Sequence, residues 1–460
     1  MGKESSGVTV TVIDKLRTRF AGGSHDAIVQ RLFGPGIIAL VIKLASAVLS
    51  YAMFVVLARV LSHAEYGKFA FSFNLGITLA TVAGLGATTA IMRFWPQYTV
   101  TNRPDLARGV LKAGALWTLY ASLATGLAIA ATSPFVDRLF PDGSTGHVIM
   151  AGLLVPAIAL NEYASSALRA HGLTLWSLAP RDVFWRAAVP AFAALLAWRG
   201  GTMDARGALL MAAGLLLSVT ALQAIKCLRV FDLKGPSATD WPAWRSATAP
   251  MWGAAILFAM VQQFDVVISG FFLTPAETGS YFAAQKTATL LGLLLIAGNM
   301  VGAPLIAGHF HGGDHKGLKR LCAYLAAGIA IPTFIGFGVM ALIGHQLLAI
   351  FDPAFVSAYP ILLVLAAGAT FDAMAGPTAY FLQMSGHERT YLIIMAVTYM
   401  GVIAMQFLLA PVWGALGIAI PTAVGVIVWN AWAVIVLRRA TGIDPSAIGA
   451  LAFFFKKTAD

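Results

Sequence analysis

The stretch IIALVIKLASAVLSYAMFVVLARV, residues 37–60, is an apolar run in which Lys43 and Arg59 are the only charged residues. An α-helix rises about 1.5 Å per residue, so a run of this length reaches across the roughly 30 Å hydrocarbon core of a bilayer. Backbone polar groups in that core must be satisfied within the segment, and a helix does this. The stretch therefore predicts a membrane-spanning helix.

The composition extends this interpretation to the whole chain. Of its 460 residues, 59% are hydrophobic and only 11% are charged. Soluble domains carry about 25% charged residues, so this chain cannot cover a soluble surface. The net charge of +11 comes from basic residues between apolar runs, a pattern typical of loops beside anionic lipid and not of nucleic-acid binding.

Eleven more apolar runs follow the first. They are residues 69–92, 110–132, 147–168, 182–198, 207–227, 248–273, 281–306, 321–345, 356–384, 391–411 and 414–437. The sequence predicts an all-α membrane protein with about 12 transmembrane helices. The outer loops between these runs are too short to fold into a catalytic domain, which argues against an enzyme.

Loop charges orient the predicted bundle. Of the 31 lysines and arginines, 24 fall on the side of the N-terminus and 5 on the other, while Lys43 and Lys286 lie inside runs. The count of 24 includes Arg181 and Arg186, which are grouped with Arg169 in the loop that leads into the fifth run. Since cytoplasmic loops are rich in Lys and Arg, both termini are predicted to be cytoplasmic.

The second half of the chain repeats the first. LSHAEYGKF at 61–69 and LTPAETGSY at 273–281 share Leu, Ala, Glu and Gly, with Gly67 and Gly279 lying 212 residues apart. LRAHG at 168–172 resembles LQMSG at 382–386, and LFP at 139–141 resembles IFD at 350–352. An even number of spans per repeat gives two lobes that run in the same direction, with substrate handled between them near the midplane.

The predicted organisation follows from the repeat. It consists of a cytoplasmic basic segment 1–35, an N-lobe of six helices 36–230, a cytoplasmic inter-lobe loop 231–246, a C-lobe of six helices 247–438 and a cytoplasmic tail 439–460.

Several motifs resemble the polysaccharide transporter, or oligosaccharidyl-lipid flippase, branch of the multidrug/oligosaccharidyl-lipid/polysaccharide (MOP) flippase superfamily. They are LARVL at 57–61 with EYGKFA at 65–70, DVVISGFFL at 265–273 with ETGSY at 277–281, and LQMSGH at 382–387. The resemblance implies a flippase that moves undecaprenyl-diphosphate-linked oligosaccharide repeat units, of O-antigen or exopolysaccharide, across the bacterial inner membrane by alternating access.

The resemblance also implies partners and leaves rivals open. The partners are lipid-linked oligosaccharide and membrane lipids, with a polysaccharide polymerase and chain-length proteins nearby, and no nucleic acid. No cofactor or metal is expected beyond coupling to H⁺ or Na⁺. A drug/cation antiporter or a peptidoglycan-precursor flippase of the same superfamily also fits the repeat, and a membrane polysaccharide polymerase fits less well because the outer loops are short.

Two lysines inside predicted spans, Lys43 and Lys286, are candidates to bind the diphosphate, because an ammonium offers a compact charge and three donors. Asn74, which occupies the place of Lys286 in the repeat, and Gln285 are the neutral candidates for the same substrate site. Structural alternatives remain: Lys43 reaches the cytoplasmic interface, or Lys286 pairs with Asp265.

Three carboxylates inside predicted spans, Glu162, Asp265 and Asp372, are candidates for ion coupling. Charged groups at the bilayer centre cost about 2.5–3.5 kcal/mol on insertion scales, so they face a cavity or a partner. A carboxylate in such a cavity binds a proton or cation that drives transport. The structural alternative is a hydrogen bond to a neighbouring helix.

Overall fold

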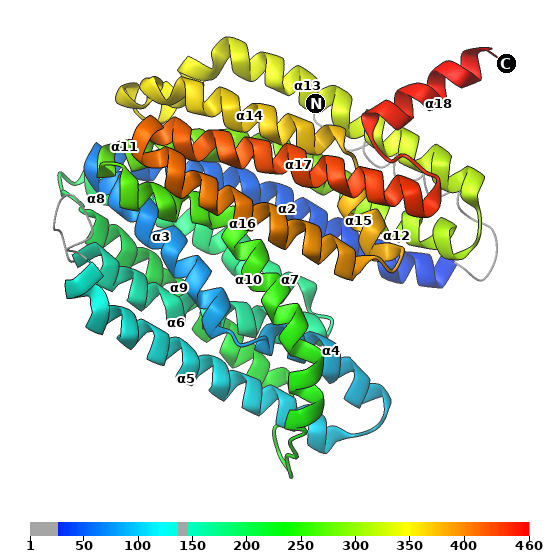
Figure 1. Cartoon of the computed structure of the whole chain (residues 1–460). Coiled ribbons are helices and arrows are strands. Elements are labelled where there is room, and N and C mark those ends of the chain that lie inside the picture. The colour runs from blue at the N-terminus through cyan, green and yellow to red at the C-terminus, as the bar shows by residue number, and fades with distance from the viewer. Residues whose placement is uncertain (1–25, 137–145, 460) are drawn as a thin grey trace, which may run out of the picture.

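The computed structural model describes residues 26–136 and 146–459, and every regular element in these two ranges is helical (Figure 1). Residues 1–25 of the predicted N-terminal segment and the 139–141 part of the repeat lie outside them. The prediction of an all-α fold is confirmed for the described part of the chain.

The first half of the chain forms one series of helices. They are α2 (Asp26–Val60), α3 (His63–Ala83), α4 (Ala87–Val100), α5 (Pro104–Val136), α6 (Gly146–Ala170), α7 (Thr174–Ala179), the π-helix η2 (Pro180–Trp185), α8 (Arg186–Trp198) and α9 (Ala205–Val230).

The second half follows the same order. Its helices are α10 (Trp241–Phe272), α11 (Pro275–Ala288), η3 (Thr289–Gly292), α12 (Leu293–His311), α13 (His315–Phe351), η4 (Pro353–Ala358), α14 (Tyr359–Met374), α15 (Thr378–Met384), α16 (Glu388–Trp413) and α17 (Ala415–Thr441). The tail adds α18 (Ala447–Ala459).

In the described part of the chain, ten helices are long and apolar enough to cross a membrane, and α3 with α4, bent by 45°, makes an eleventh span. The predicted span 182–198 lies in the continuous helical stretch α7–η2–α8, which carries Arg181, Asp182 and Arg186. The protein is therefore a multi-pass membrane protein. Each predicted span falls mainly on helix, but turns at 84–86 and 375–377 interrupt the predicted spans 69–92 and 356–384.

The repeated motif has a structural cause. Ser62 caps α3 by accepting a hydrogen bond from the Glu65 N–H at 3.4 Å. Thr274 and Glu277 form a reciprocal capping box at the start of α11. A hydroxyl at the N-cap and a glutamate three residues later satisfy backbone N–H groups that a helix start leaves free. The motif thus starts the second helix of each half.

The glycine shared by the two motifs permits close packing. A Cβ on Gly67 would lie 1.6 Å from the Pro275 carbonyl oxygen, and one on Gly279 would lie 3.2 Å from the Gly67 nitrogen. Helices α3 and α11 therefore meet backbone to backbone at two repeat-related positions. We call this end of the bundle, where α2 turns into α3 and α10 into α11, the outer end, following the orientation predicted from the loop charges.

The two halves lie as two groups in space. In Figure 1, helices α12–α17 lie together across the top and α5–α9 below them, with α3, α10 and α11 between. Helix α10 also contacts the first half near its start. Its Trp244 Nε1 donates to the Tyr98 hydroxyl at 2.9 Å, and its Trp252 Nε1 donates to the carbonyl oxygens of Thr81 and Val82 at 3.2 Å each.

Candidate functional site

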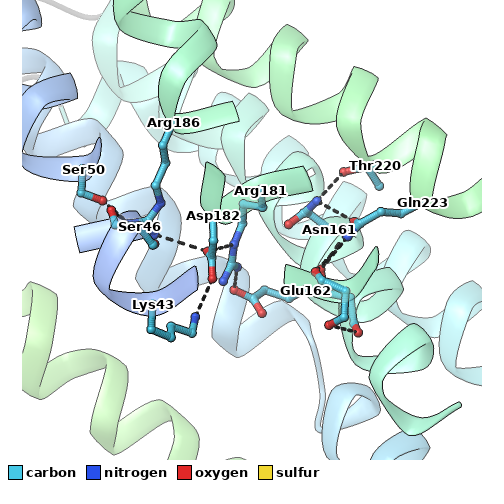
Figure 2. Close-up of polar contacts among 12 residues, drawn as sticks. Lys43, Ser46, Ser50, Asn161, Glu162, Arg181, Asp182, Arg186, Thr220 and Gln223 are labelled. Atoms are coloured by element: carbon cyan, nitrogen blue, oxygen red, sulfur yellow. Dashed lines mark hydrogen bonds and ion pairs between the residues drawn. The ribbon is translucent and has the colours of Figure 1, made fainter. Parts of the chain in front are cut away.

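Five charged side chains meet inside the first half of the bundle (Figure 2). We call them the N-lobe charge cluster. They are Lys43 of α2, Glu162 of α6, Arg181 and Asp182 of η2, and Arg186 at the start of α8.

Asp182 lies at the centre of the cluster. Its side chain exposes 0% of its surface, and Lys43 Nζ contacts its Oδ2 at 2.6 Å. Arg181 Nε contacts the other oxygen, Oδ1, at 3.2 Å, and Arg186 Nη2 lies 3.7 Å from it. Arg181 also pairs with Glu162. Three cations and two carboxylates give the cluster a formal charge of +1.

The local sequence explains why these groups converge. Pro180 lacks an N–H, so a regular helical hydrogen bond is lost where α7 meets η2. The chain then adopts a π-helix over Pro180–Trp185, a widened turn that is frequent at functional sites. Trp185 Nε1 donates to the Ala212 carbonyl oxygen at 2.9 Å and holds this turn against α9.

Arg186 has spare hydrogen-bonding capacity. Its Nη1 donates to the Ser46 carbonyl oxygen at 3.1 Å and to the Ser50 hydroxyl, both on α2. Its Nε is buried and has no partner in the described part of the chain. A guanidinium with an unused donor is suited to an additional acceptor such as a phosphate oxygen.

A neutral network adjoins the charge cluster. Asn161, next to Glu162 on α6, donates to the Thr220 hydroxyl at 3.1 Å and to Gln223 Oε1 at 3.0 Å, both on α9. Gln223 Nε2 in turn donates to the carbonyl oxygens of Trp176 and Ser177 at 3.0 and 3.1 Å. These hydrogen bonds connect α6, α7 and α9 beside the cluster. Figure 2 shows those from Asn161 to Thr220 and Gln223.

The structure places Lys286 of α11 differently from Lys43. Its ammonium lies 4.9 Å from the centre of the Phe282 ring and 5.7 Å from that of Phe54, a residue of α2. Within the described residues its ammonium forms no ion pair or hydrogen bond, so the predicted alternative of a direct pair with Asp265 is not seen. At longer range its charge is repelled by that of Arg186, across the boundary between the two halves, and attracted by that of Asp265.

Asp265 of α10 is enclosed by neutral donors. Gln406 Nε2 donates to its Oδ1 at 3.0 Å, and the hydroxyls of Thr422 and Tyr281 donate to its Oδ2 at 2.9 and 3.3 Å. The same Gln406 nitrogen also faces the Ile418 carbonyl oxygen at 3.3 Å. Asp265 thus joins α10, α11, α16 and α17.

The other two carboxylates have one visible partner each. Asp372 of α14 accepts a hydrogen bond from Asn430 Nδ2 on α17 at 2.8 Å. Glu162 pairs with Arg181, and 42% of its side chain is exposed. The structural alternative predicted for these residues, contact with a neighbouring helix, is present, and their part in ion coupling stays a prediction.

The neutral substrate candidates are buried with free acceptors. Asn74 exposes 0% of its surface and donates to the Ala70 carbonyl oxygen, while its Oδ1 has no partner among the described residues. Gln285, next to Lys286, also has an unpartnered buried Oε1. Asn74 is enclosed in this conformation, so a ligand reaches it only after the helices move.

Arg181, Asp182 and Arg186 are not among the site residues predicted from the sequence, because the two arginines are counted there with a loop. The signal was present: Asp182 and Arg186 are spaced i, i+4 at the start of an apolar run, and a helix places such residues on one face. Removing the two arginines from the loop count leaves the predicted orientation unchanged.

Comparisons with known proteins agree with this arrangement. The family model described as polysaccharide biosynthesis protein matches residues 35–308. No curated protein sequence matches the chain.

The fold is shared with solved transporters. An inward-facing multidrug resistance MATE family transporter of the MOP superfamily has a TM-score of 0.66 at 16% identity, over 88% of this chain and 98% of its own. The lipid II flippase MurJ, in an inward closed conformation, has a TM-score of 0.66 at 14% identity, over 92% and 93%. An outward-facing MATE transporter has a TM-score of 0.58 at 16% identity, over 96% and 99%. The chain thus has the fold of the MOP transporters and belongs to the polysaccharide biosynthesis protein family.

Proposed function

We propose that this protein flips an oligosaccharide carried on a polyprenyl diphosphate, such as undecaprenyl diphosphate, from the inner to the outer leaflet of the bacterial inner membrane. The observation that carries the proposal is the positive N-lobe charge cluster together with the unpaired Lys286 on the facing half. A diphosphate brings negative charge into the membrane, and cations with free donors are the groups that stabilise it there.

The exposed edge of the cluster supports this assignment. Lys43 exposes 40% of its side chain although Asp182 holds its ammonium. A charged side chain in a spanning helix faces water or a partner because lipid contact is costly. We therefore propose that the diphosphate lies against the exposed part of Lys43, and that the buried Nε of Arg186 reaches it once the helices move. Lys286 would approach from the second half, and the sugars would lie toward the neutral side chains.

Cells that lack the protein test this proposal. Loss of surface polysaccharide, with lipid-linked repeat units trapped on the cytoplasmic leaflet, is the expected result. Wild-type protein restores export, and a Lys43→Ala, Lys286→Ala double variant made at equal level does not. A matched control, Lys68→Ala, removes a lysine at the outer end, where it pairs with Glu65 at 3.0 Å.

Other results point to the rival functions. Repeat units that reach the outer leaflet but stay unpolymerised would indicate a polymerase. Normal polysaccharide with altered drug tolerance would indicate an antiporter. Arrested growth with trapped peptidoglycan precursor would indicate a flippase for that lipid. Each of these three outcomes contradicts the proposed substrate.

A further inference from the structure

At the outer end, the last turn of α2 contacts the last turn of α13, in the other half of the protein. Arg59 Nε donates to the Ile350 carbonyl oxygen at 2.7 Å, and Arg59 Nη2 donates to that of Ala349 at 2.8 Å. The last carbonyls of a helix lack intrahelical partners and form the negative end of its dipole. Arg59 therefore caps a helix of the second half with a charge from the first.

A second polar contact between the halves lies one turn further along. His63 Nε2, at the start of α3, lies 2.7 Å from Asp352 Oδ1, which follows α13. Partial burial opposes ionisation of this carboxyl, but hydrogen bonds from the Ala354 N–H and from His63, with the nearby charge of Arg59, hold its pKa below the ordinary value. Asp352 is thus a carboxylate at neutral pH, in contact with His63 and near the charge of Arg59.

Apolar packing lies beside these contacts. The Tyr66 ring stacks on Phe355 of η4 with centroids 5.6 Å apart, and Tyr51 meets Phe351 edge to face at 5.2 Å. Together with the Gly67–Gly279 approach, these contacts close the outer end between the halves. In Figure 1 the two groups of helices also come together at this end, near α3, α8 and α11.

We infer that Arg59, His63 and Asp352 form a latch that holds the outer end shut in the inward-facing state and opens when cargo is released outward. The inference does not depend on which cargo the protein carries. Its contacts join residues about 290 positions apart in different lobes, and His63 and Asp352 expose 45% and 24% of their side chains. Exposed pairs of this kind contribute little individually, so they break and re-form within a transport cycle.

The two basic residues of the latch occur in the first half and are not repeated in the second. At the positions 212 residues after Arg59 and His63, the second half has Phe271 and Pro275, which carry no charge. Arg59 and His63 therefore have no charged counterparts at the equivalent positions of the second half.

The test measures the distance between the lobes at the outer end. In a background with Cys227→Ser and Cys322→Ala, spin labels are placed at the exposed positions Arg199 and Ser357 and read by pulsed electron resonance in liposomes. With both Arg59→Gln and Asp352→Asn, we expect the long-distance population to rise by about two- to tenfold, the range that the loss of one or two weak polar contacts produces.

The matched control is Lys68→Gln, which breaks the 3.0 Å pair with Glu65 at the same end but within one lobe. We expect it to leave the distances unchanged. If the doubly substituted protein keeps the wild-type distances, or if Lys68→Gln shifts them equally, the latch is refuted. Should the double variant fail to fold, His63→Gln, which removes the ring contacting Asp352, takes its place under the same criteria.

Discussion

The two halves of the bundle stabilise charge inside the membrane in opposite ways. In the first half, Asp182 is surrounded by Lys43, Arg181 and Arg186, so ionic contacts dominate. In the second half, the contacts of Asp265 come from an amide and two hydroxyls, and Lys286 rests on aromatic rings. The first half therefore contains a buried ionic cluster, and the second half contains a lysine, Lys286, whose ammonium has no ion-pair partner among the described residues.

The internal repeat shows at which positions the two halves differ in charge. Counted from the equivalent glycines Gly172 and Gly386, the positions of Arg181, Asp182 and Arg186 are occupied in the second half by Met395, Ala396 and Met400. The equivalent positions of the second half thus carry no charge. This asymmetry gives the first half a cluster of five charged side chains and the second half the lysine Lys286 on aromatic rings.

The largest effect should follow from removing the central anion. Asp182→Asn leaves three cations without their shared buried carboxylate, and breaking such a buried pair costs about 3–5 kcal/mol. We expect a correspondingly lower thermal unfolding midpoint in detergent. Asp265→Asn is the control: because its partners are neutral and can still hydrogen-bond to an amide, it should cost less than about 1.5 kcal/mol. Equal losses would contradict the contrast between the halves.

Removing the free cation of the second half should affect transport and not stability. Lys286→Ala deletes an ammonium that has no counter-ion among the described residues, so the unfolding midpoint should stay the same or rise. If Lys286 contacts the diphosphate, export should fall about tenfold or more, as for other charged hydrogen bonds. Lys286→Arg keeps the charge and should retain part of the activity. Unchanged export by the alanine variant would exclude Lys286 from the substrate site.

A smaller effect is expected on ion coupling, where substitutions of Asp265 and Glu162 should differ. Glu162 is already engaged by Arg181, whereas Asp265 contacts groups that do not neutralise it. We therefore expect Asp265→Asn to reduce the stimulation of transport by an imposed H⁺ or Na⁺ gradient several-fold, and Glu162→Gln to preserve most of it. Flipping in liposomes with and without the gradient measures this. Loss of stimulation in Glu162→Gln alone would move the coupling site to the first half.

Local features made much of the fold predictable. Apolar run length predicts the spans, and the LSHAE and LTPAE motifs encode the N-caps of α3 and α11. The charge cluster was not predictable in the same way. Lys43 and Asp182 are 139 residues apart, and the π-helix that aligns them depends on how η2 packs against α9. Lys286 was identified because a charge stands out in an apolar run, but its aromatic contact with Phe54 of α2 depends on tertiary structure.

The smallest predicted effect concerns the segment that joins the halves. Arg108 of α5 donates to the Asp232 carbonyl oxygen at 3.3 Å, to the Pro236 carbonyl oxygen at 3.0 Å and to the Asp232 carboxylate at 3.2 Å. Ala238 N–H also donates to the Asp105 carbonyl oxygen at 3.0 Å. The linker is thus attached to the first half, and we expect Arg108→Ala to increase its protease sensitivity while leaving the global unfolding midpoint nearly unchanged.

The pH dependence of this attachment has a definite sign. Hydrogen bonds from the Lys234 N–H and from Arg108 lower the pKa of Asp232 below its ordinary value of 3.8. A carboxyl whose pKa is lower in the folded state stabilises the attachment above the ordinary pKa and loses that contribution as pH falls through the lowered one. Wild-type linker should therefore resist an acid protease at pH 5 and become more sensitive as the pH falls through the lowered pKa of Asp232, while Arg108→Ala is sensitive throughout. Equal cleavage of both proteins at pH 5 would mean that the bonds to Arg108 do not hold the linker.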